Sequence, residues 1–109
     1  MVKPRTFPRR GEVWLVNLDP VTGSEMAKSR PALVLSPDEL NAYLHTVIVV
    51  PLTSTIRHYP FRADVRFARR RGSLAVDQVR ALDRTRLTRR VGTLDPAPAL
   101  SVLREMFSD

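Results

Sequence analysis

The sequence contains no cysteine among its 109 residues and only two histidines, His45 and His58. The absence of cysteine excludes a disulfide framework and any thiolate metal site. Two isolated histidines do not have the ligand spacing of a metal centre, so we expect neither a metal ion nor another cofactor. A chain without disulfides is compatible with a reducing compartment, and we expect the protein to be cytoplasmic.

Long hydrophobic runs are also missing, since none approaches the roughly twenty residues of a membrane span. The N-terminal segment, MVKPRTFPRRGE, lacks the apolar core of a signal peptide. The four glycines do not form a loop of the kind that binds nucleoside triphosphates. The length fits one domain, so we predict a single domain over residues 1–109, with residues 1–9 as a flexible N-terminal arm.

Positive charge is abundant and unevenly distributed. Eighteen Lys and Arg face eleven Asp and Glu, and sixteen of the eighteen basic residues are arginine. Residues 57–90 alone hold eleven arginines against three aspartates, a net charge of +8. Because the guanidinium group pairs with phosphate through two hydrogen bonds, this pattern favours a polyanionic partner, either a nucleic acid or an acidic protein segment.

Alternating and continuous apolar segments predict a protein made mainly of short β-strands. The third strand is expected to be buried on both faces and to end or bulge at Pro51, because proline cannot donate to a strand ladder. In the fourth strand, Phe61 and Phe67 are expected to face the core and Arg62 the solvent. The predicted strands cover residues 12–18, 31–36, 45–55, 61–67, one or two segments of 73–82, and 91–94.

Two helices and one helical turn are expected between and after the strands. Ser36 is the predicted N-cap of a short helix that starts at Pro37, and Asp83 caps a turn over 84–90. Asp95 is the predicted N-cap of a C-terminal helix whose apolar stripe is Leu100, Leu103 and Phe107. The sum is a small β-barrel with helical additions.

Arg30 and Thr53 are candidates for chemistry because each lies where a predicted strand meets a loop. Pro31 forces Arg30 into an extended conformation at the start of its strand. If the two strand ends converge, they offer a fixed cation and a hydroxyl that could stabilise the negative charge of a phosphodiester transition state. The spacing alone equally allows a loop-capping arginine and an ordinary threonine at a strand end.

Three separated blocks of the sequence carry a resemblance that decides between these alternatives. They are RGEVWLVNLDPVTGSEMAKSRPALVLSPDELN (10–41), VVPLTST (49–55) and DQVRALDRTRL (77–87). Together they closely resemble the MazF/PemK family of toxin endoribonucleases, in order and over nearly the whole chain. The resemblance implies an SH3-like barrel with a C-terminal helix, commonly assembled as a homodimer.

The resemblance also implies an activity, which is metal-independent cleavage of single-stranded RNA at short sequences. The products are a 2′,3′-cyclic phosphate and a 5′-hydroxyl. The family's active-site arginine corresponds to Arg30 and its threonine to Thr53, and the acid of the GSE block, Glu25, has a role in some members. The implied protein partner is an antitoxin whose acidic, partly disordered tail fills the RNA groove.

Some positions depart from the family pattern, in which glutamine commonly follows the acid and a glycine often precedes the arginine. Here Met26 and the segment Ala27–Ser29 replace them, so loop motion and base preference are expected to differ. Because guanidinium is a poor proton acceptor, we assign Arg30 to phosphate stabilisation and leave the base open between Glu25, His58 and water. The further predicted RNA-binding residues are Lys28, Ser54, Thr55, Arg57, His58, Gln78, Arg80, Arg84 and Arg86.

Two other functions remain to be considered from the sequence. A toxin of the same barrel type could bind and inhibit a topoisomerase, as the CcdB relatives do, without needing Arg30 and Thr53 together. A plain nucleic-acid-binding barrel would bind RNA with strong salt dependence but would not cut it. Trp14 could stack on a base, or it could lie in the core or at a dimer contact. Arg69–Arg71 are interpreted as a solvated turn.

Overall fold

The computed structural model of the protein describes residues 6–18, 29–55 and 60–109. Within these residues, seven strands and two α-helices follow one another, with two short 3₁₀ turns, η1 (Val76–Gln78) and η2 (Arg84–Arg86), beside strand six. The strands are β1 (Glu12–Asn17), β2 (Ser29–Val34), β3 (Thr46–Thr53), β4 (Ala63–Phe67), β5 (Arg70–Leu74), β6 (Arg80–Asp83) and β7 (Leu87–Thr93). The helices are α1 (Asp38–Asn41) and α2 (Ala97–Met106).

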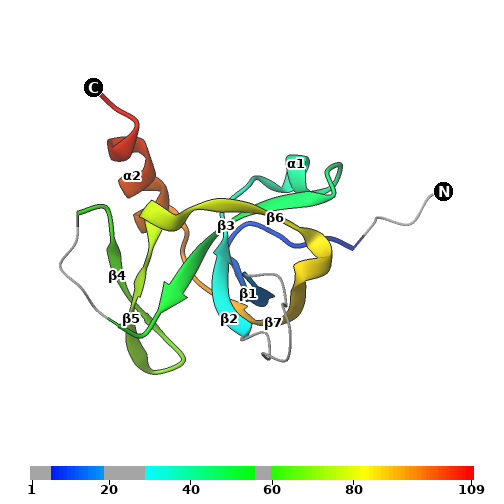
Figure 1. The fold of residues 1–109 in the computed structure, drawn as a ribbon, viewed down its shortest axis with the longest axis horizontal. Coiled ribbons are helices and arrows are strands. Elements are labelled where there is room, and N and C mark those ends of the chain that lie inside the picture. The colour runs from blue at the N-terminus through cyan, green and yellow to red at the C-terminus, as the bar shows by residue number, and fades with distance from the viewer. Residues whose placement is uncertain (1–5, 19–28, 56–59) are drawn as a thin grey trace, which may run out of the picture.

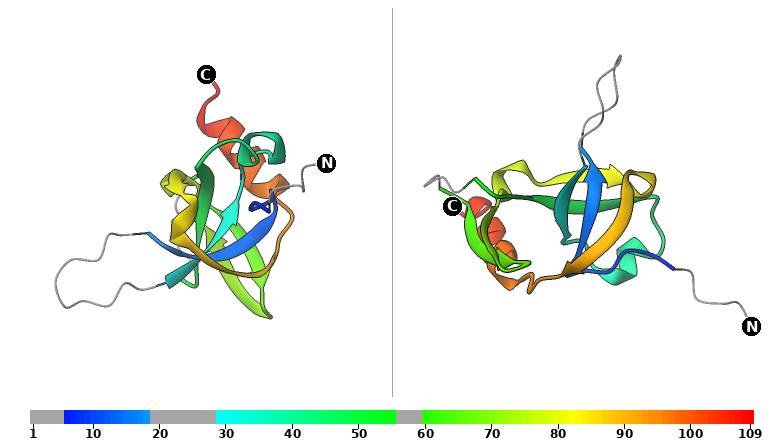
Figure 2. Two further views of the ribbon diagram at one scale, coloured as in Figure 1. Left: turned by 90° about the vertical axis from the view of Figure 1, so that its right-hand side faces the viewer. Right: turned by 90° about the horizontal axis from the view of Figure 1, so that it is seen from below.

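The strands form one antiparallel sheet that curls into a half-barrel (Figure 1). The strand order is β4-β5-β3-β2-β1-β7, and β6 pairs with the first half of β3, on the same edge as β5. Helix α2 packs against β4 and η1, as the views of Figure 2 also show. The expectation of a mainly β barrel with a short inserted helix and a C-terminal helix is therefore confirmed.

Two apolar clusters occupy the two faces of the curled sheet. Val13, Leu33, Val50 and Leu74 lie in the first cluster, against which α2 packs. The second cluster fills the concave side between β1, β2, β3, β6 and β7, and it includes Val16, Ala32, Val34, Val47, Val49, Leu82 and Leu87. Alternate residues of β2 and β3 thus serve different clusters, as the two-residue period of a strand requires.

Strand β3 continues through Pro51 to Thr53, so the prediction that it ends or bulges at the proline is wrong. The pairing of β3 explains why the proline is tolerated. Thr46–Val49 pair with β6, whereas Leu52 and Thr53 pair with β5. Pro51 lies between these two ladders, where no N–H donor is needed, and its carbonyl accepts a hydrogen bond from Ala75. Ile48 is exposed, so β3 is not buried on both faces throughout.

The predicted cap at Ser36 is also wrong, because α1 begins after Pro37 and has no side-chain cap. The Ser36 hydroxyl instead donates to the Asn41 side chain and accepts from the Ile48 N–H. Asn41 is fully buried and donates to the carbonyls of Pro8 and Ser36, at 3.0 and 2.9 Å. This network joins residue 8 and α1 to the start of β3.

The caps predicted further along the chain hold in part. Asp83 caps η2 by accepting from the Thr85 N–H, as expected, but the turn ends at Arg86 and strand β7 follows directly, so the predicted extent of 84–90 is wrong. Asp95 accepts from the Ala97 N–H, but the N-cap position of α2 itself is Pro96, one residue later than predicted. In the described part of the chain, no helix is long and apolar enough to cross a membrane.

Two phenylalanines that were expected in the core lie outside it. Phe107 is 77% exposed and follows the last helical residue, so it does not belong to the buried stripe of α2. Phe61 is exposed and lies before β4, which begins only at Ala63. Its backbone has a positive φ of 62°, so it belongs to a turn and does not follow the alternation of the strand.

Candidate functional site

Arg30 and Thr53 lie at the same end of two paired antiparallel strands. Ala32 of β2 pairs with Pro51 of β3 as the last pair of this ladder, and Arg30 and Thr53 each lie two residues beyond it, towards the same end. Both continue the row of side chains that begins with the second apolar cluster, so they lie where the concave side of the half-barrel opens to solvent. Arg30 is exposed and Thr53 is half-buried. The predicted convergence of the two strand ends is therefore present.

Two open pockets meet at this pair, and Arg30, Leu52 and Thr53 line both of them. The first, which we call the hairpin pocket, has a volume of about 370 Å³ and extends to the β4–β5 hairpin, where Arg70 and Arg71 line it. The second, the barrel-end pocket, measures about 430 Å³ and extends to η1 and β6. The ends of β2 and β3 thus form a ridge between two hollows.

The hydroxyl of Thr53 is held by its own loop. Its Oγ1 accepts a hydrogen bond of 3.1 Å from the Thr55 N–H, which is the local turn that threonine commonly forms at a strand end. Because this bond occupies a lone pair, the hydroxyl proton is available to donate elsewhere. A donor whose oxygen is fixed in this way suits the stabilisation of a developing negative charge.

The backbone beneath Thr53 depends on a glycine. A Cβ atom on Gly72 of β5 would lie 2.9 Å from the carbonyl oxygen of Thr53 and 3.4 Å from the Leu52 side chain. Thr53 also pairs directly with Ser73, whose buried hydroxyl has no hydrogen-bond partner among the described residues. The β3–β5 pairing at this point is therefore closer than any residue with a side chain at position 72 would allow.

The electrostatic character of the two pockets is uniformly positive. Arg30, Arg62, Arg70, Arg71 and Arg80 line one or both, and no carboxylate is among the described residues that line them. The Arg62 side chain is 9% exposed, and its Nε lies 3.0 Å from Asp77 Oδ1. Arg62 therefore does not face the solvent as predicted, because it pairs with Asp77 of η1 across the hairpin.

The structure distributes the other candidate residues over three places. Ser54 lines the hairpin pocket, and Thr55, Gln78 and Arg80 line the barrel-end pocket. Arg84 and Arg86 lie outside both pockets. Arg84 donates to the Thr6 carbonyl at 2.8 Å, and Arg86 donates to the carbonyls of Asn17 and Leu18 at 3.3 Å. The candidates Glu25, Lys28, Arg57 and His58 lie outside the described residues.

Arg70 and Arg71 are two charged residues that line the hairpin pocket but are not predicted from the sequence to belong to the site. The sequence RRRG suggests that they belong to a solvated turn, but the turn consists of Ala68 and Arg69, and strand β5 already begins at Arg70. Phe67 pairs with Arg70 across this two-residue connection. The Asn-Gly or Asp-Gly signal that marks such turns is missing here, so little in the sequence indicates where the turn lies.

Trp14 does not lie at either of these pockets. Its ring packs against the second apolar cluster, and its Nε1–H donates to Glu12 Oε1 at 3.0 Å. Burial raises the pKa of Glu12, but hydrogen bonds from Arg9, Trp14 and Arg90 outweigh it and hold that pKa below its ordinary value. Among the described residues, no group of three or more His, Cys, Asp or Glu side chains is placed to hold a metal ion.

Known proteins resemble this chain over nearly its full length. A family model described as PemK-like, MazF-like toxin of type II toxin–antitoxin system matches residues 9–106. Endoribonuclease MazF9 of Mycobacterium tuberculosis is 40% identical over 101 residues, which cover 82% of this chain and 84% of the relative. Endoribonuclease toxin MazF of Escherichia coli is 37% identical over 93 residues, which cover 84% of each protein.

Solved structures resemble the fold as well. The crystal structure of MazF from Deinococcus radiodurans matches with a TM-score of 0.77 at 28% identity, covering 94% of this chain and 97% of that one. A MazE–MazF crystal structure from the same organism has the same TM-score, 0.77, at 28% identity, and covers 94% of each chain.

Proposed function

Since the chain belongs to the family of PemK-like, MazF-like toxins of type II toxin–antitoxin systems, we propose that it is a metal-independent endoribonuclease that cuts single-stranded RNA at specific sequences. The observation that carries this proposal is the position of Arg30 and Thr53. They form the ridge between two arginine-lined pockets, where an RNA backbone can cross from one pocket to the other. The names of the relatives, which are endoribonucleases, support the same activity.

The reaction we propose uses the nucleophile that RNA itself carries. The 2′-hydroxyl oxygen attacks the adjacent phosphorus, a new P–O bond closes the 2′,3′-cyclic phosphate, and the bond to the 5′-oxygen breaks. The 2′-hydroxyl proton passes to a base, for which Glu25, His58 and water are the candidates. The leaving 5′-oxygen gains a proton and ends as a 5′-hydroxyl.

Arg30 and Thr53 act on the charge that accumulates on the phosphoryl oxygens. Because guanidinium stays protonated at all relevant pH values, Arg30 serves as a hydrogen-bond donor to the phosphate and to the leaving oxygen, not as a base. Thr53 donates its hydroxyl proton to a phosphoryl oxygen, since its own oxygen already accepts from Thr55. Donors that are in place before the reaction lower its barrier by more than groups that must reorganise.

We assign RNA binding to the polar residues around the ridge. Ser54, Thr55, Gln78 and Arg80 line the two pockets and contact the strand on either side of the scissile phosphate. Arg84 and Arg86 act at longer range through their charge, since their guanidinium groups are engaged with backbone carbonyls. Lys28, Arg57 and His58, which lie outside the described residues, complete the proposed binding surface.

The same positive surface would bind a protein inhibitor. A MazE–MazF complex is among the solved structures that this chain resembles. We propose that the cognate antitoxin places an acidic segment over the two pockets and thereby excludes RNA, and that the toxin itself is a cytoplasmic homodimer.

The experiment that tests the proposal is cleavage of a long unstructured RNA by purified protein in excess EDTA. Discrete cuts with 2′,3′-cyclic phosphate ends, identified by their resistance to 3′ ligation until the phosphate is removed, would support it. Intact RNA in the presence of a growth-inhibiting protein would contradict it and would favour the alternative toxin, which inhibits a topoisomerase.

A further inference from the structure

The tip of the β4–β5 hairpin has an unusual backbone. Ala68 and Arg69 form its two-residue turn, and both have positive φ angles, 53° and 65°. This is the conformation of a type I′ turn, which normally carries Asn or Gly because other side chains are strained there. Contacts elsewhere in the hairpin must therefore hold the turn in place.

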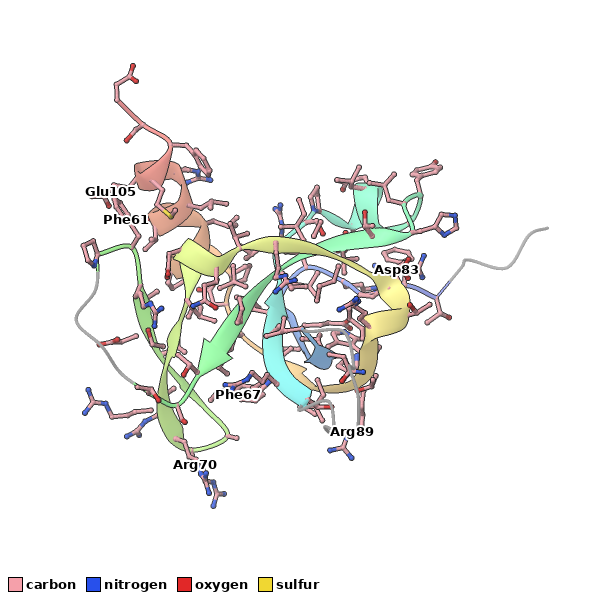
Figure 3. The ribbon with its side chains drawn as sticks, viewed as in Figure 1. Phe61, Phe67, Arg70, Asp83, Arg89 and Glu105 are labelled. Carbon is pink, nitrogen blue, oxygen red and sulfur yellow. The ribbon has the colours of Figure 1, made fainter. Side chains whose placement is uncertain are left out.

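One contact beside this turn joins the two terminal strands of the sheet order, β4 and β7. A Cβ atom on Gly92 of β7 would lie only 2.7 and 2.8 Å from two ring carbons of Phe67, at the end of β4. The Phe67 ring is thus seated directly on the backbone of β7, although β4 and β7 are the two terminal strands of the sheet order. In Figure 3, Phe67 lies on the side of the hairpin that faces β2, and Arg70 lies at the lower end of the hairpin.

This contact lies beside a second set of cations at the pocket that Arg30 lines. Phe67, Ala68, Arg70 and Arg71 of the hairpin line the hairpin pocket together with Arg30 and Thr53. No carboxylate is among the described lining residues, and none of the ion pairs found within the described chain involves Arg70 or Arg71. The pair is therefore available to an anion in the pocket.

We propose that Arg70 and Arg71 form a second phosphate-binding wall for the RNA strand, and that Phe67, seated on Gly92, is the positioning residue that fixes the distance of this wall from Arg30. The inference rests on the proposed endoribonuclease function and names how its substrate is held. The wall binds a phosphate next to the scissile one, and the apolar part of the pocket, formed by Phe67, Pro31 and Leu52, receives the adjoining base by stacking.

Binding is measured separately from cleavage, so that the two proposals fail in different ways. The background is Thr53→Ala, and the probe is a fluorescein-labelled segment of the RNA that the unmodified protein cuts. Adding Arg70→Ala or Arg71→Ala should raise the dissociation constant about five- to tenfold and reduce the slope of log K against log salt by about one. Arg104→Ala removes the same charge from a residue of helix α2 that does not line the pocket, and it should change the dissociation constant less than twofold.

The positioning role is tested with charge unchanged. Gly92→Ala keeps every arginine, but its methyl group collides with Phe67, so it should weaken RNA binding several-fold and flatten the salt slope as Arg70→Ala does. Phe67→Leu lacks the two ring carbons that collide. In the Phe67→Leu background, Gly92→Ala should therefore raise the dissociation constant for RNA by less than a further twofold. If Gly92→Ala does not fold, Phe67→Ala, which leaves β7 untouched, carries the same expectation. Urea unfolding of each variant confirms that the binding protein is native.

The outcomes are distinct. If the unmodified protein cuts RNA but Arg70→Ala and Arg104→Ala bind it equally well, the phosphate-binding wall is wrong and the endoribonuclease proposal stands. If Gly92→Ala weakens binding equally with Phe67 present and in the Phe67→Leu background, the positioning role of Phe67 is wrong. If the unmodified protein cuts no RNA, the proposed function fails before this test begins.

Discussion

Gly72 of β5 lies so close to Thr53 of β3 that a Cβ atom at position 72 would come within 2.9 Å of the Thr53 carbonyl oxygen. Contacts of this length between a Cβ and a backbone atom essentially do not occur, so a side chain at position 72 must displace one of the strands. The backbone that carries the Thr53 hydroxyl is therefore set by a glycine on the neighbouring strand. This relationship connects the packing of the sheet to the proposed chemistry.

Gly72→Ala should accordingly reduce RNA cleavage. The added methyl group shifts the Thr53 main chain and with it the donor hydroxyl, and misplacement of a catalytic group by a fraction of an ångström to an ångström lowers the rate by roughly ten- to a hundredfold. The expected change is in kcat, with KM altered much less, measured on a short RNA that contains the cut sequence. Unchanged kcat in Gly72→Ala would show that the position of Thr53 does not limit the reaction.

Ser73 provides a test of the packing next to Thr53. Its hydroxyl is buried and has no partner among the described residues, so removing it should relieve a desolvation cost. We expect Ser73→Ala to raise the free energy of unfolding by about 1 kcal/mol. Ser36→Ala is the matched comparison, because the Ser36 hydroxyl makes two hydrogen bonds and its loss should destabilise the protein by about 1–3 kcal/mol. Urea unfolding distinguishes the two, and equal destabilisation by both would contradict the assignment.

The strained hairpin turn gives a third prediction. Arg69 has a φ of 65°, which glycine adopts readily and other residues adopt at a cost of about 1 kcal/mol. Arg69→Gly should therefore be more stable than Arg69→Ala by about 1 kcal/mol, although both variants remove the same charge. The comparison is made by urea unfolding at one pH and one salt concentration. An alanine variant as stable as the glycine variant would mean that the turn is not strained.

The pH dependence of stability should depend on Glu12. Its folded-state pKa lies below the ordinary value of 4.5, so the ionised form favours the native state. That contribution is complete above the unfolded pKa and is lost as pH falls through the lower folded pKa. Glu12→Gln should destabilise the protein at pH 7, and the difference from the unmodified protein should shrink as the pH is lowered from about 5 towards about 3. Glu105→Gln removes an exposed carboxylate and serves as the control. A constant difference across this range would contradict the role of Glu12.

The sequence predicts the elements of this fold better than the relations between them. Arg30 can be placed at the start of a strand from its neighbour Pro31. Thr53 is the last residue of β3, but the expectation that led to it, a strand end at Pro51, is wrong. Their register across β2 and β3 cannot be derived from the sequence, because it depends on the connection through α1. In the sequence, Pro51 looks like a strand breaker. The strand accommodates it because β3 changes partners there from β6 to β5, and that change is a property of the whole sheet.

The position of Arg70 and Arg71 at the site could not be predicted from the sequence, and the reason is local. A two-residue hairpin turn is recognised by Asn or Gly, and here Ala68 and Arg69 occupy it. The contact of Phe67 with Gly92 joins residues 25 positions apart in the chain, and no short-range pattern reports it. Residues 19–28, which carry Glu25 and Lys28, lie outside the described residues, so their assignments remain predictions.

In the proposed mechanism, Arg30 and Thr53 act together on one phosphate. The most direct measurement is the single-turnover cleavage rate, in EDTA, of Arg30→Ala, Thr53→Ala and the double variant, with Arg104→Ala on α2 as a charge-matched control. We predict that each single variant cleaves about a hundredfold or more slowly than the unmodified protein, and that Arg104→Ala cleaves at the normal rate. The double variant should cleave only a little more slowly than the slower of the two single variants. Normal cleavage by either Arg30→Ala or Thr53→Ala would contradict the claim.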